Sequence, residues 1–300
     1  MSVKFKTIYI RNFDSINAHV GWIVNNRVNK HNFRLYPAKL VHFDFSGCKF
    51  PKPYHIAPLA CLIYEYQEKG FTIKLVNIPG AINEYFNAFN FNQFCRKEEY
   101  NNFPTPSDPA ILPLWRIEQT ASNIYPVHAK EYFEQLHFAD KSLFALGNSL
   151  AELMNNIFDH SGSLIPGYTF THLSKNNIIT CVCDFGIGIP KKVNNYLKVS
   201  NKECLDNISA LKKALELKFS TLSMPHNRGF GWDNIVSVVT ALKGRMVIIS
   251  NNVIYRLYSN SPAKAFLMEN NFPGTSIVIF LNTDSLPVKE KEITDELTIL

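Results

Sequence analysis

The feature that most constrains the fold is an alternation of strand and helix patterns in the first third of the chain. A strand pattern at 39–45 is followed by an amphipathic helix pattern at 56–69, which Gly70 ends, and by a second strand pattern at 71–78. Strand, helix and strand at this spacing indicate a right-handed crossover and a parallel pair. The sequence therefore predicts an α/β fold.

A proline-rich stretch divides the chain into two predicted domains. Four prolines fall between residues 104 and 113, and proline at this density interrupts helices and strands. The 300 residues also suit two domains, at roughly 150 residues each. We expect a first domain over residues 1–105 and a second over 106–300.

The second domain has its own helix and strand patterns. Helices are expected at 140–158 and from Trp232, and a further helix is expected within a Lys/Asn-rich insert. Residues 82–94 of the first domain show the same helical period. Strands are expected at 178–184, 246–250, 254–258 and 276–281, and a charged tail at 287–300.

Charge and hydropathy exclude several classes of protein. There are 31 basic and 25 acidic residues, a net charge of +6, which allows an anionic partner. The basic residues are scattered and form no recognisable motif, which argues against nucleic acid. No apolar run approaches the ~18 residues of a membrane helix, and the start of the chain has a strand pattern unlike that of a signal peptide. We expect a cytoplasmic protein with no membrane association.

A polar stripe on the 140–158 helix is the first candidate site. Glu152, Asn156 and Asp159 lie on one side of the helix, next to an apolar stripe. A carboxylate and an amide one turn apart can hold water and a hard cation such as magnesium. The alternative is an ordinary solvated face. The apolar stripe consists of Leu146, Leu150, Leu153 and Ile157.

The second candidate follows the 178–184 strand. Asp184 ends that strand, and Gly186 and Gly188 come directly after it. A carboxylate there can accept a hydrogen bond from an exocyclic amine such as that of adenine, and the glycines allow close approach of the backbone. The alternative is a simple turn, which aspartate and glycine also favour.

Two further fragments contain glycine next to a helix or strand. Arg228, Gly229 and Gly231 lead into the helix from Trp232, where backbone amides at a helix N-terminus can bind phosphate. Gly274 and Thr275 lead into the 276–281 strand, where the Thr275 hydroxyl can contact a base edge or a water. Each fragment taken alone could equally be an ordinary helix or strand start.

In this order, the four fragments resemble the N, G1, G2 and G3 boxes of the GHKL ATPases, the family of histidine kinases, DNA gyrase, MutL and related chaperones, with the anti-sigma serine kinases close by. The likeness spans about 138–281 and implies a Bergerat-type sandwich, a mixed sheet covered by helices, that binds ATP and Mg²⁺. It implies the metal at Asn156 and a general base at Glu152. It also implies that a further set of residues contacts the nucleotide: Asp159, Asp184, Gly186, Gly188, Arg228, Gly229, Gly231 and Thr275.

The resemblance has further consequences and two departures. The insert at about 190–228 corresponds to the ATP lid, which is expected to be partly helical over 204–217. Trp232 stands where the family commonly has an aliphatic residue. His128 and His137 lack the context of a phosphoacceptor histidine, which argues against a self-phosphorylating sensor kinase.

The first domain resembles a STAS domain, the fold of anti-sigma-factor antagonists, over residues 44–79. The carrying feature is Asp44, Ser46 and Gly47 at the end of a strand pattern. The loop at 52–55 has no serine in the position that accepts phosphate in that family. The resemblance therefore implies a degenerate module that has lost the phosphorylation switch.

Together these patterns predict an ATP-binding protein that couples MgATP binding or hydrolysis and lid closure to the regulation of a partner protein. A second copy of the chain is among the candidate partners. Two alternatives stay open: a serine/threonine protein kinase of the anti-sigma type, and an ATP sensor that does not hydrolyse its ligand.

Overall fold

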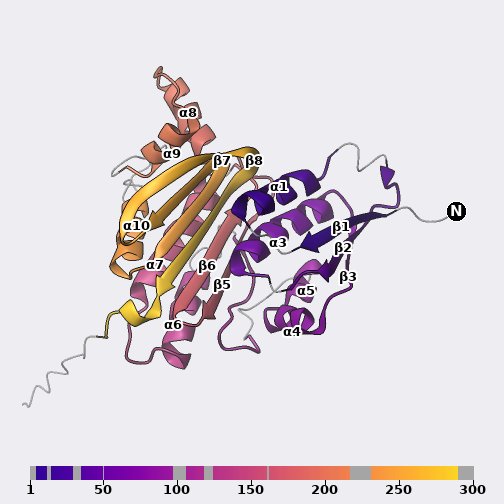
Figure 1. Cartoon of the computed structure of the whole chain (residues 1–300), viewed down its shortest axis with the longest axis horizontal. Helices are drawn as coiled ribbons and strands as arrows, with labels where there is room; N and C mark the ends of the chain where they lie inside the picture. Colours follow the sequence, from indigo (N-terminus) through magenta and orange to yellow (C-terminus); the bar gives the residue numbers. More distant parts are fainter. Residues whose placement is uncertain are drawn as a thin grey trace, which may run out of the picture.

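The protein has a mixed α/β architecture in which helices and sheets alternate as layers (Figure 1). The computed structural model describes residues 5–11, 15–29, 35–49, 51–96, 106–117, 124–160, 162–216 and 231–289. Across Figure 1 a helical layer, an antiparallel sheet, a second helical layer and a parallel sheet follow one another. The α/β class expected from the sequence is confirmed.

The first sheet is parallel, with strand order β1-β2-β3. In β2 and β3, Val41 pairs with Ile73 and Phe43 with Leu75, so the predicted parallel pair is confirmed. Helices α1 and α3 connect these strands. Their apolar residues, such as Val20 and Ile63, are completely buried. The elements are β1 (Lys6–Arg11), α1 (Ile16–Asn26), β2 (Leu40–Gly47), α3 (Pro53–Glu68) and β3 (Thr72–Val76).

Two short helices follow the parallel sheet where the sequence predicts one. These are α4 (Gly80–Ala88) and α5 (Phe91–Cys95). Asn90 separates them because its backbone is left-handed, with φ of 61°, which a continuing helix does not allow. The break lets Phe89 turn inward to pack against Phe170 of the second sheet, with ring centroids 4.4 Å apart.

The second sheet has strand order β4-β5-β6-β8-β7 and is antiparallel at each pairing. The mixed sheet implied for this half is therefore an antiparallel one. The strands predicted at 246–250 and 254–258 both lie in β7. β7 folds back on itself, so that the Ser259 N–H, just after its end, donates to the carbonyl oxygen of Gly244, just before its beginning. The strands are β4 (Trp115–Ile117), β5 (Gly167–Ser174), β6 (Asn177–Asp184), β7 (Arg245–Tyr258) and β8 (Ser261–Asn282).

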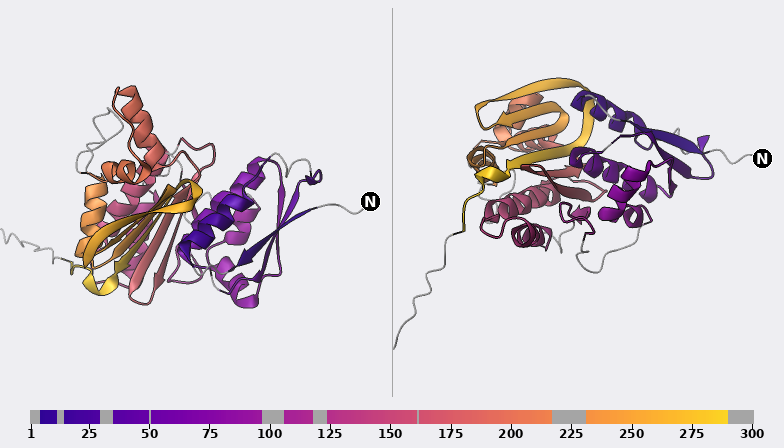
Figure 2. Two further views of the ribbon diagram at one scale, coloured as in Figure 1. Left: turned by 45° about the horizontal axis from the view of Figure 1, so that its top comes forward. Right: turned by 60° about the horizontal axis from the view of Figure 1, so that its bottom comes forward.

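Three helices, α6 (Ile124–Leu136), α7 (Phe144–His160) and α10 (Gly231–Ala241), cover one face of this sheet (Figures 1 and 2). The predicted apolar stripe of α7 is buried against strand residues such as Val182 and Ile277. The helix expected at 140–158 and the one from Trp232 are thus confirmed, with boundaries shifted by a few residues.

Helices α1 and α3 cover the opposite face of the antiparallel sheet (Figure 2). The apolar core on this side runs from Ile8 in β1 through α3 to Phe280 in β8. The two sheets therefore share one core. The division at residue 105 stays a prediction, and residues 97–105 lie outside the described ranges.

Two helices, α8 (Ile189–Val199) and α9 (Asn207–Ala214), extend from one end of the antiparallel sheet (Figure 1). They pack on each other through Val193, Leu197 and Ala210. A helix within 204–217 is confirmed by α9. A short 3₁₀ turn, Thr283–Ser285, follows β8, and residues 290–300 lie outside the described ranges. Among the described helices, none combines the length and the apolar character needed to span a bilayer.

Candidate functional site

Residues of three strands face the α7 and α10 layer at one end of the antiparallel sheet. Side chains alternate between the two faces of a strand. Asp184 therefore shares a face with Val182, and Thr275 with Ile277; both of these apolar residues pack in the core under α7 and α10. Ser250 belongs to the same face as Ile248. Two sequence-predicted residues, Asp184 and Thr275, are thus directly paired in the ladder between β6 and β8.

Asp184 is a buried carboxylate with no cation against it among the described residues. It is 2% exposed, and it accepts hydrogen bonds from the backbone N–H of Gly186, at 2.7 Å, and from that of Thr275. Burial raises the pKa of Asp184 to about 7, and the two N–H donors oppose that rise. A carboxylate can accept more hydrogen bonds than these two, so Asp184 retains acceptor capacity toward a ligand amine.

Gly274 is the residue that lets the second and fourth sequence fragments meet. Its φ is 86°, and a β-carbon at this position would overlap the Asp184 carbonyl oxygen and the Gly186 nitrogen. Only glycine adopts this backbone and leaves that space. The Asp184 carboxylate is held in place by the same turn.

A serine hydroxyl that the sequence analysis missed joins these fragments. Ser250 is completely buried; its Oγ donates to the Gly274 carbonyl oxygen at 3.0 Å and lies 2.9 Å from Oγ1 of Thr275. It also accepts the N–H of Ile189, at the start of α8, at 2.8 Å. We call Asp184, Gly186, Ser250, Gly274 and Thr275 the Asp184 cluster.

Gly188 lies against Asn251, which forms the turn within β7. Its φ is 82°, and a β-carbon there would overlap the side-chain amide of Asn251. Asn251 Nδ2 donates to the Ile187 carbonyl oxygen at 3.0 Å, and its Oδ1 accepts the N–H of Lys191. The signal that could have found Ser250 and Asn251 is the polar Ser-Asn-Asn run between two strand patterns, which marks a turn.

The first and third fragments meet where α7 contacts the start of α10. A β-carbon on Gly231 would overlap Oε2 of Glu152, so the carboxylate occupies the space left by the missing side chain. Partial burial raises the pKa of Glu152. Helix α10 begins at Gly231 among the described residues, and the N-terminal end of a helix carries a partial positive charge that favours an anion.

Asn156 lies one turn beyond Glu152 on α7. Its Nδ2 atom is buried and has no hydrogen-bond partner among the described residues. A buried amide without a partner is costly, and a ligand is one way to satisfy it. We call Glu152, Asn156 and Gly231 the Glu152 cluster. Asp159 is in the last turn of α7, but its side chain lies outside the described part of the structure.

Two predicted phosphate-binding residues belong to the segment between α9 and α10. Arg228 and Gly229 lie outside the described residues, as does the remainder of 217–230. Trp232, the departure from the family pattern, is partly buried against the core under α7 and α10. Of the predicted lid, the structure describes α8 and α9.

The residues present fit an adenine nucleotide with a divalent cation. The retained acceptor capacity of Asp184 suits an exocyclic amine, the unpartnered Nδ2 donor of Asn156 suits a phosphate oxygen, and the amide oxygen of the same side chain is of the type that Mg²⁺ prefers. In the described ranges, no three His, Cys, Asp or Glu side chains gather to hold a metal ion.

The loop implied by the STAS resemblance begins α3. Asp44, near the end of β2, accepts the N–H of Ser46 at 2.8 Å and the Nδ2 group of Asn77 at 2.7 Å. The hydroxyl group of Ser46, and then these two hydrogen bonds, lower the pKa of Asp44. Asp44 thus stabilises the β2 turn. The 52–55 loop supplies the N-cap and first turn of α3, and Lys52 N–H donates to Nδ1 of His55.

Comparison with known proteins adds no relative to this picture. The chain matches no family model and no curated protein sequence. The function must therefore be argued from the site.

Proposed function

We propose that the protein binds MgATP in the space between the Asp184 cluster and the Glu152 cluster, and that the bound nucleotide regulates its contact with a partner protein. The observation that carries the proposal is that fragments around residues 152, 184, 231 and 275 meet pairwise at two points on one face of the sheet. Gly231 leaves room for Glu152, and Gly274 leaves room for the Asp184 turn.

Each residue has a specific task in this proposal. Asp184 accepts a hydrogen bond from the adenine amine, with the Thr275 hydroxyl beside it. Asn156 holds the magnesium ion, and the N-terminus of α10 holds phosphate. ATP bound with magnesium supplies a γ-phosphoryl group for transfer to water or to a hydroxyl group.

The presence of Glu152 favours a catalytic function over that of an ATP sensor. A sensor needs a metal ligand but no general base, and Glu152 is a partly buried carboxylate whose pKa is raised. A raised pKa brings a carboxyl group closer to the range in which it can take a proton from a nucleophile near neutral pH. Glu152 would orient the attacking water or hydroxyl group and accept its proton.

The lid helices give the nucleotide a route to a partner. α8 starts at Ile189, whose N–H is bonded to Ser250 of the Asp184 cluster. A ligand bound at the Asp184 cluster would therefore lie next to the start of α8, and α8 and α9 extend from the sheet at this point (Figure 1). A difference in affinity between the two lid arrangements is what would couple the nucleotide to a partner.

Isothermal titration of the full chain with MgATP tests binding. We expect Asp184→Asn to weaken binding at least about hundredfold, because a buried ionic acceptor is lost. Asn156→Ala should abolish the magnesium-dependent part. The matched control is Asp284→Asn, which removes an exposed carboxylate bonded to Asn176. No heat with the unmodified chain, or equal affinity in Asp184→Asn and Asp284→Asn, contradicts the proposal.

Labelled ATP separates the catalytic alternatives. Release of free phosphate indicates an ATPase, label on a serine or threonine of a partner chain indicates a kinase, and binding with neither product indicates a sensor. Glu152→Gln should bind MgATP and lose either product.

A further inference from the structure

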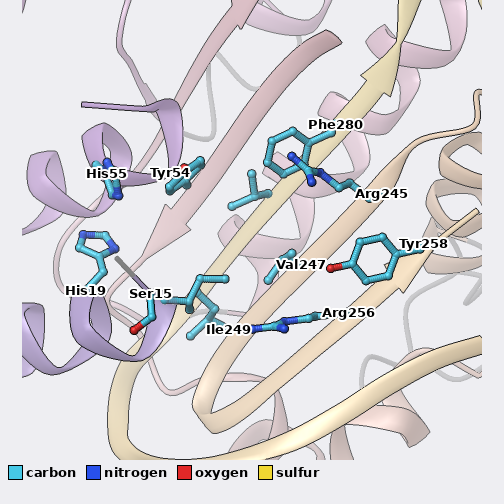
Figure 3. A pocket seen from close by; sticks show the side chains of 12 residues that line it. Ser15, His19, Tyr54, His55, Arg245, Val247, Ile249, Arg256, Tyr258 and Phe280 are labelled. Carbon is cyan, nitrogen blue, oxygen red and sulfur yellow. The ribbon is translucent and has the colours of Figure 1, made fainter. Parts of the chain in front are cut away.

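A hollow lies on the face of the antiparallel sheet opposite to the candidate nucleotide site. It is lined by the first turns of α1 and α3 on one side and by β7 and β8 on the other (Figure 3). Val278 and Phe280 line it, whereas Ile277 and Ile279 face the helices that cover the candidate nucleotide site. The hollow is therefore separated from that site by the thickness of the sheet.

The side chains around this hollow are cationic and aromatic. Arg245 and Arg256 come from the two ends of β7, and His19 and His55 come from α1 and α3. No acidic residue is among those that line it. Within the described ranges, neither arginine has an ion pair. Its positive charge therefore lacks a counterion in the part of the chain that the structure describes.

The guanidinium of Arg245 is held in a defined position. It stacks over the ring of Phe280, 3.8 Å from the centroid. Stacking occupies the face of the planar group and leaves its N–H edge for acceptors in the plane. Figure 3 shows Arg245 and Phe280 together at one side of the hollow, with Tyr258 and Arg256 below them.

The imidazoles on the opposite wall are hydrogen-bond donors as neutral rings. The rings of His19 and His55 meet edge to face, with centroids 4.9 Å apart. Nδ1 of His55 accepts the Lys52 N–H, so the neutral ring carries its proton on Nε2. Burial, and then the neighbouring Lys52, lowers the pKa of His55 to about 4, and burial with His55 nearby lowers the pKa of His19.

The N-termini of two helices add to the positive electrostatic potential in the hollow. Ser15 is the N-cap of α1, and Tyr54 and His55 are in the first turn of α3. Both helix ends carry partial positive charge toward this side. Together with two guanidinium groups they favour a doubly charged anion over a singly charged one.

The volume and the apolar floor of the hollow indicate what the ligand contains besides its anionic group. The hollow has a volume of about 240 Å³, just below the ~300 Å³ at which sites for drug-sized ligands begin. Its floor is apolar, formed by Val247, Ile249 and Val278, and Tyr258 at its rim is 39% exposed. We propose that this hollow binds a small phosphate monoester that carries an aromatic ring, with the phosphate between Arg245 and Arg256 and the ring against the apolar floor.

Titration of the full chain with phenyl phosphate tests the proposal. Arg245→Gln and Arg256→Gln should each weaken binding at least about tenfold, because each removes a charged donor. The control is Lys74→Gln, which removes an exposed positive charge on β3 and should change affinity less than about twofold. Phenol, inorganic phosphate and phenylacetate should each bind more weakly than phenyl phosphate.

Several results would overturn the proposal. One is the absence of phenyl phosphate binding up to about 10 mM, because a specific site of this kind should bind the probe more tightly than that. Another is tighter binding of phenylacetate, and a third is an equal effect of Lys74→Gln. Asp184→Asn should leave the affinity for phenyl phosphate unchanged; a loss of affinity in this variant would mean that the probe occupies the nucleotide site.

Thermal unfolding without the probe shows whether each variant is folded. Arg256→Gln is the second, independent variant because it does not disturb the stack of Arg245 on Phe280.

Discussion

The Asp184 cluster is held together by residues of three strands, whereas both side chains of the Glu152 cluster project from one helix, α7, toward Gly231 of α10. In the first, Asp184 accepts backbone N–H groups and Ser250 bonds to both Gly274 and Thr275. In the second, Asn156 has a buried amide group without a partner among the described residues. The comparison teaches that the end proposed for adenine is already hydrogen-bonded, while the end proposed for phosphate and metal has one unsatisfied donor, Nδ2 of Asn156, that a ligand can satisfy.

The largest effect on this comparison is expected from Gly274→Ala. The new β-carbon would overlap the backbone of Asp184 and Gly186, and φ is 86°. Strain and overpacking together should cost about 3–5 kcal/mol of unfolding free energy. Urea unfolding measures this. Gly80→Ala is the control, since nothing lies within 4 Å of its β-carbon position; the control should change stability by less than about 1 kcal/mol. Equal stability of the two variants would mean that the Asp184 turn is not rigid.

The buried carboxylate should make stability depend on pH. Asp184 has a pKa of about 7 in the folded chain and about 3.9 when unfolded. The folded state binds the proton more tightly, so the stabilisation is complete below pH ~4 and is lost as the pH rises toward and through ~7, by about 2–4 kcal/mol.

Asp184→Asn should remove this part of the pH dependence. Unfolding by urea at several pH values checks it, and the difference between the unmodified chain and the variant isolates Asp184 from other titrating groups. The variant should be the more stable form above pH ~7 although it binds MgATP weakly. A parallel pH profile in both chains would contradict the burial of an ionisable group at this position.

A substitution in the Glu152 cluster should change turnover strongly and the free energy of unfolding only slightly. Glu152→Gln keeps the shape of the side chain beside Gly231 and removes the base. Turnover should fall about hundredfold or more, equivalent to ~2.7 kcal/mol, while the affinity for MgATP stays within about threefold. Steady-state phosphate release and calorimetry measure the two quantities. Turnover at the unmodified rate would show that Glu152 is not the base.

The smallest effect is expected from Ser250→Ala. This change leaves the Ile189 N–H and the Thr275 hydroxyl with one partner fewer, at a cost of about 1–2 kcal/mol. Urea unfolding gives the cost. Hydrogen exchange at Ile189 should also speed up, because its N–H is the link to α8. Unchanged exchange would mean that the Asp184 cluster and α8 are not coupled.

Much of the fold can be predicted from the sequence because burial patterns are local. The stripe of Leu146, Leu150, Leu153 and Ile157 correctly predicts the buried face of α7. The strand ending in Asp184 was also predicted to its last residue. The helix α1 was missed, since His19 and Gly21 interrupt its apolar pattern, and both are buried between the two sheets.

The candidate site was predicted only in part. The sequence identifies Asp184, Gly186 and Thr275 as candidates, and the structure brings them together. For Ser250 the sequence offers only the polar Ser-Asn-Asn run, which indicates a turn but not the contacts with Gly274 and Thr275. The pairing of Glu152 with Gly231 is likewise invisible in sequence, where they are far apart.

By itself, the sequence determined the periods of the helices and strands, the positions of the glycines and the types of side chain available to a ligand. Only the tertiary structure decided which of these meet: Gly274 with the Asp184 turn, Gly231 with Glu152, and Arg245 and Arg256 with the first turns of α1 and α3. The physical reason is that periodicity follows from the burial of neighbouring residues, whereas a site depends on contacts between distant residues, which the packing of whole layers sets.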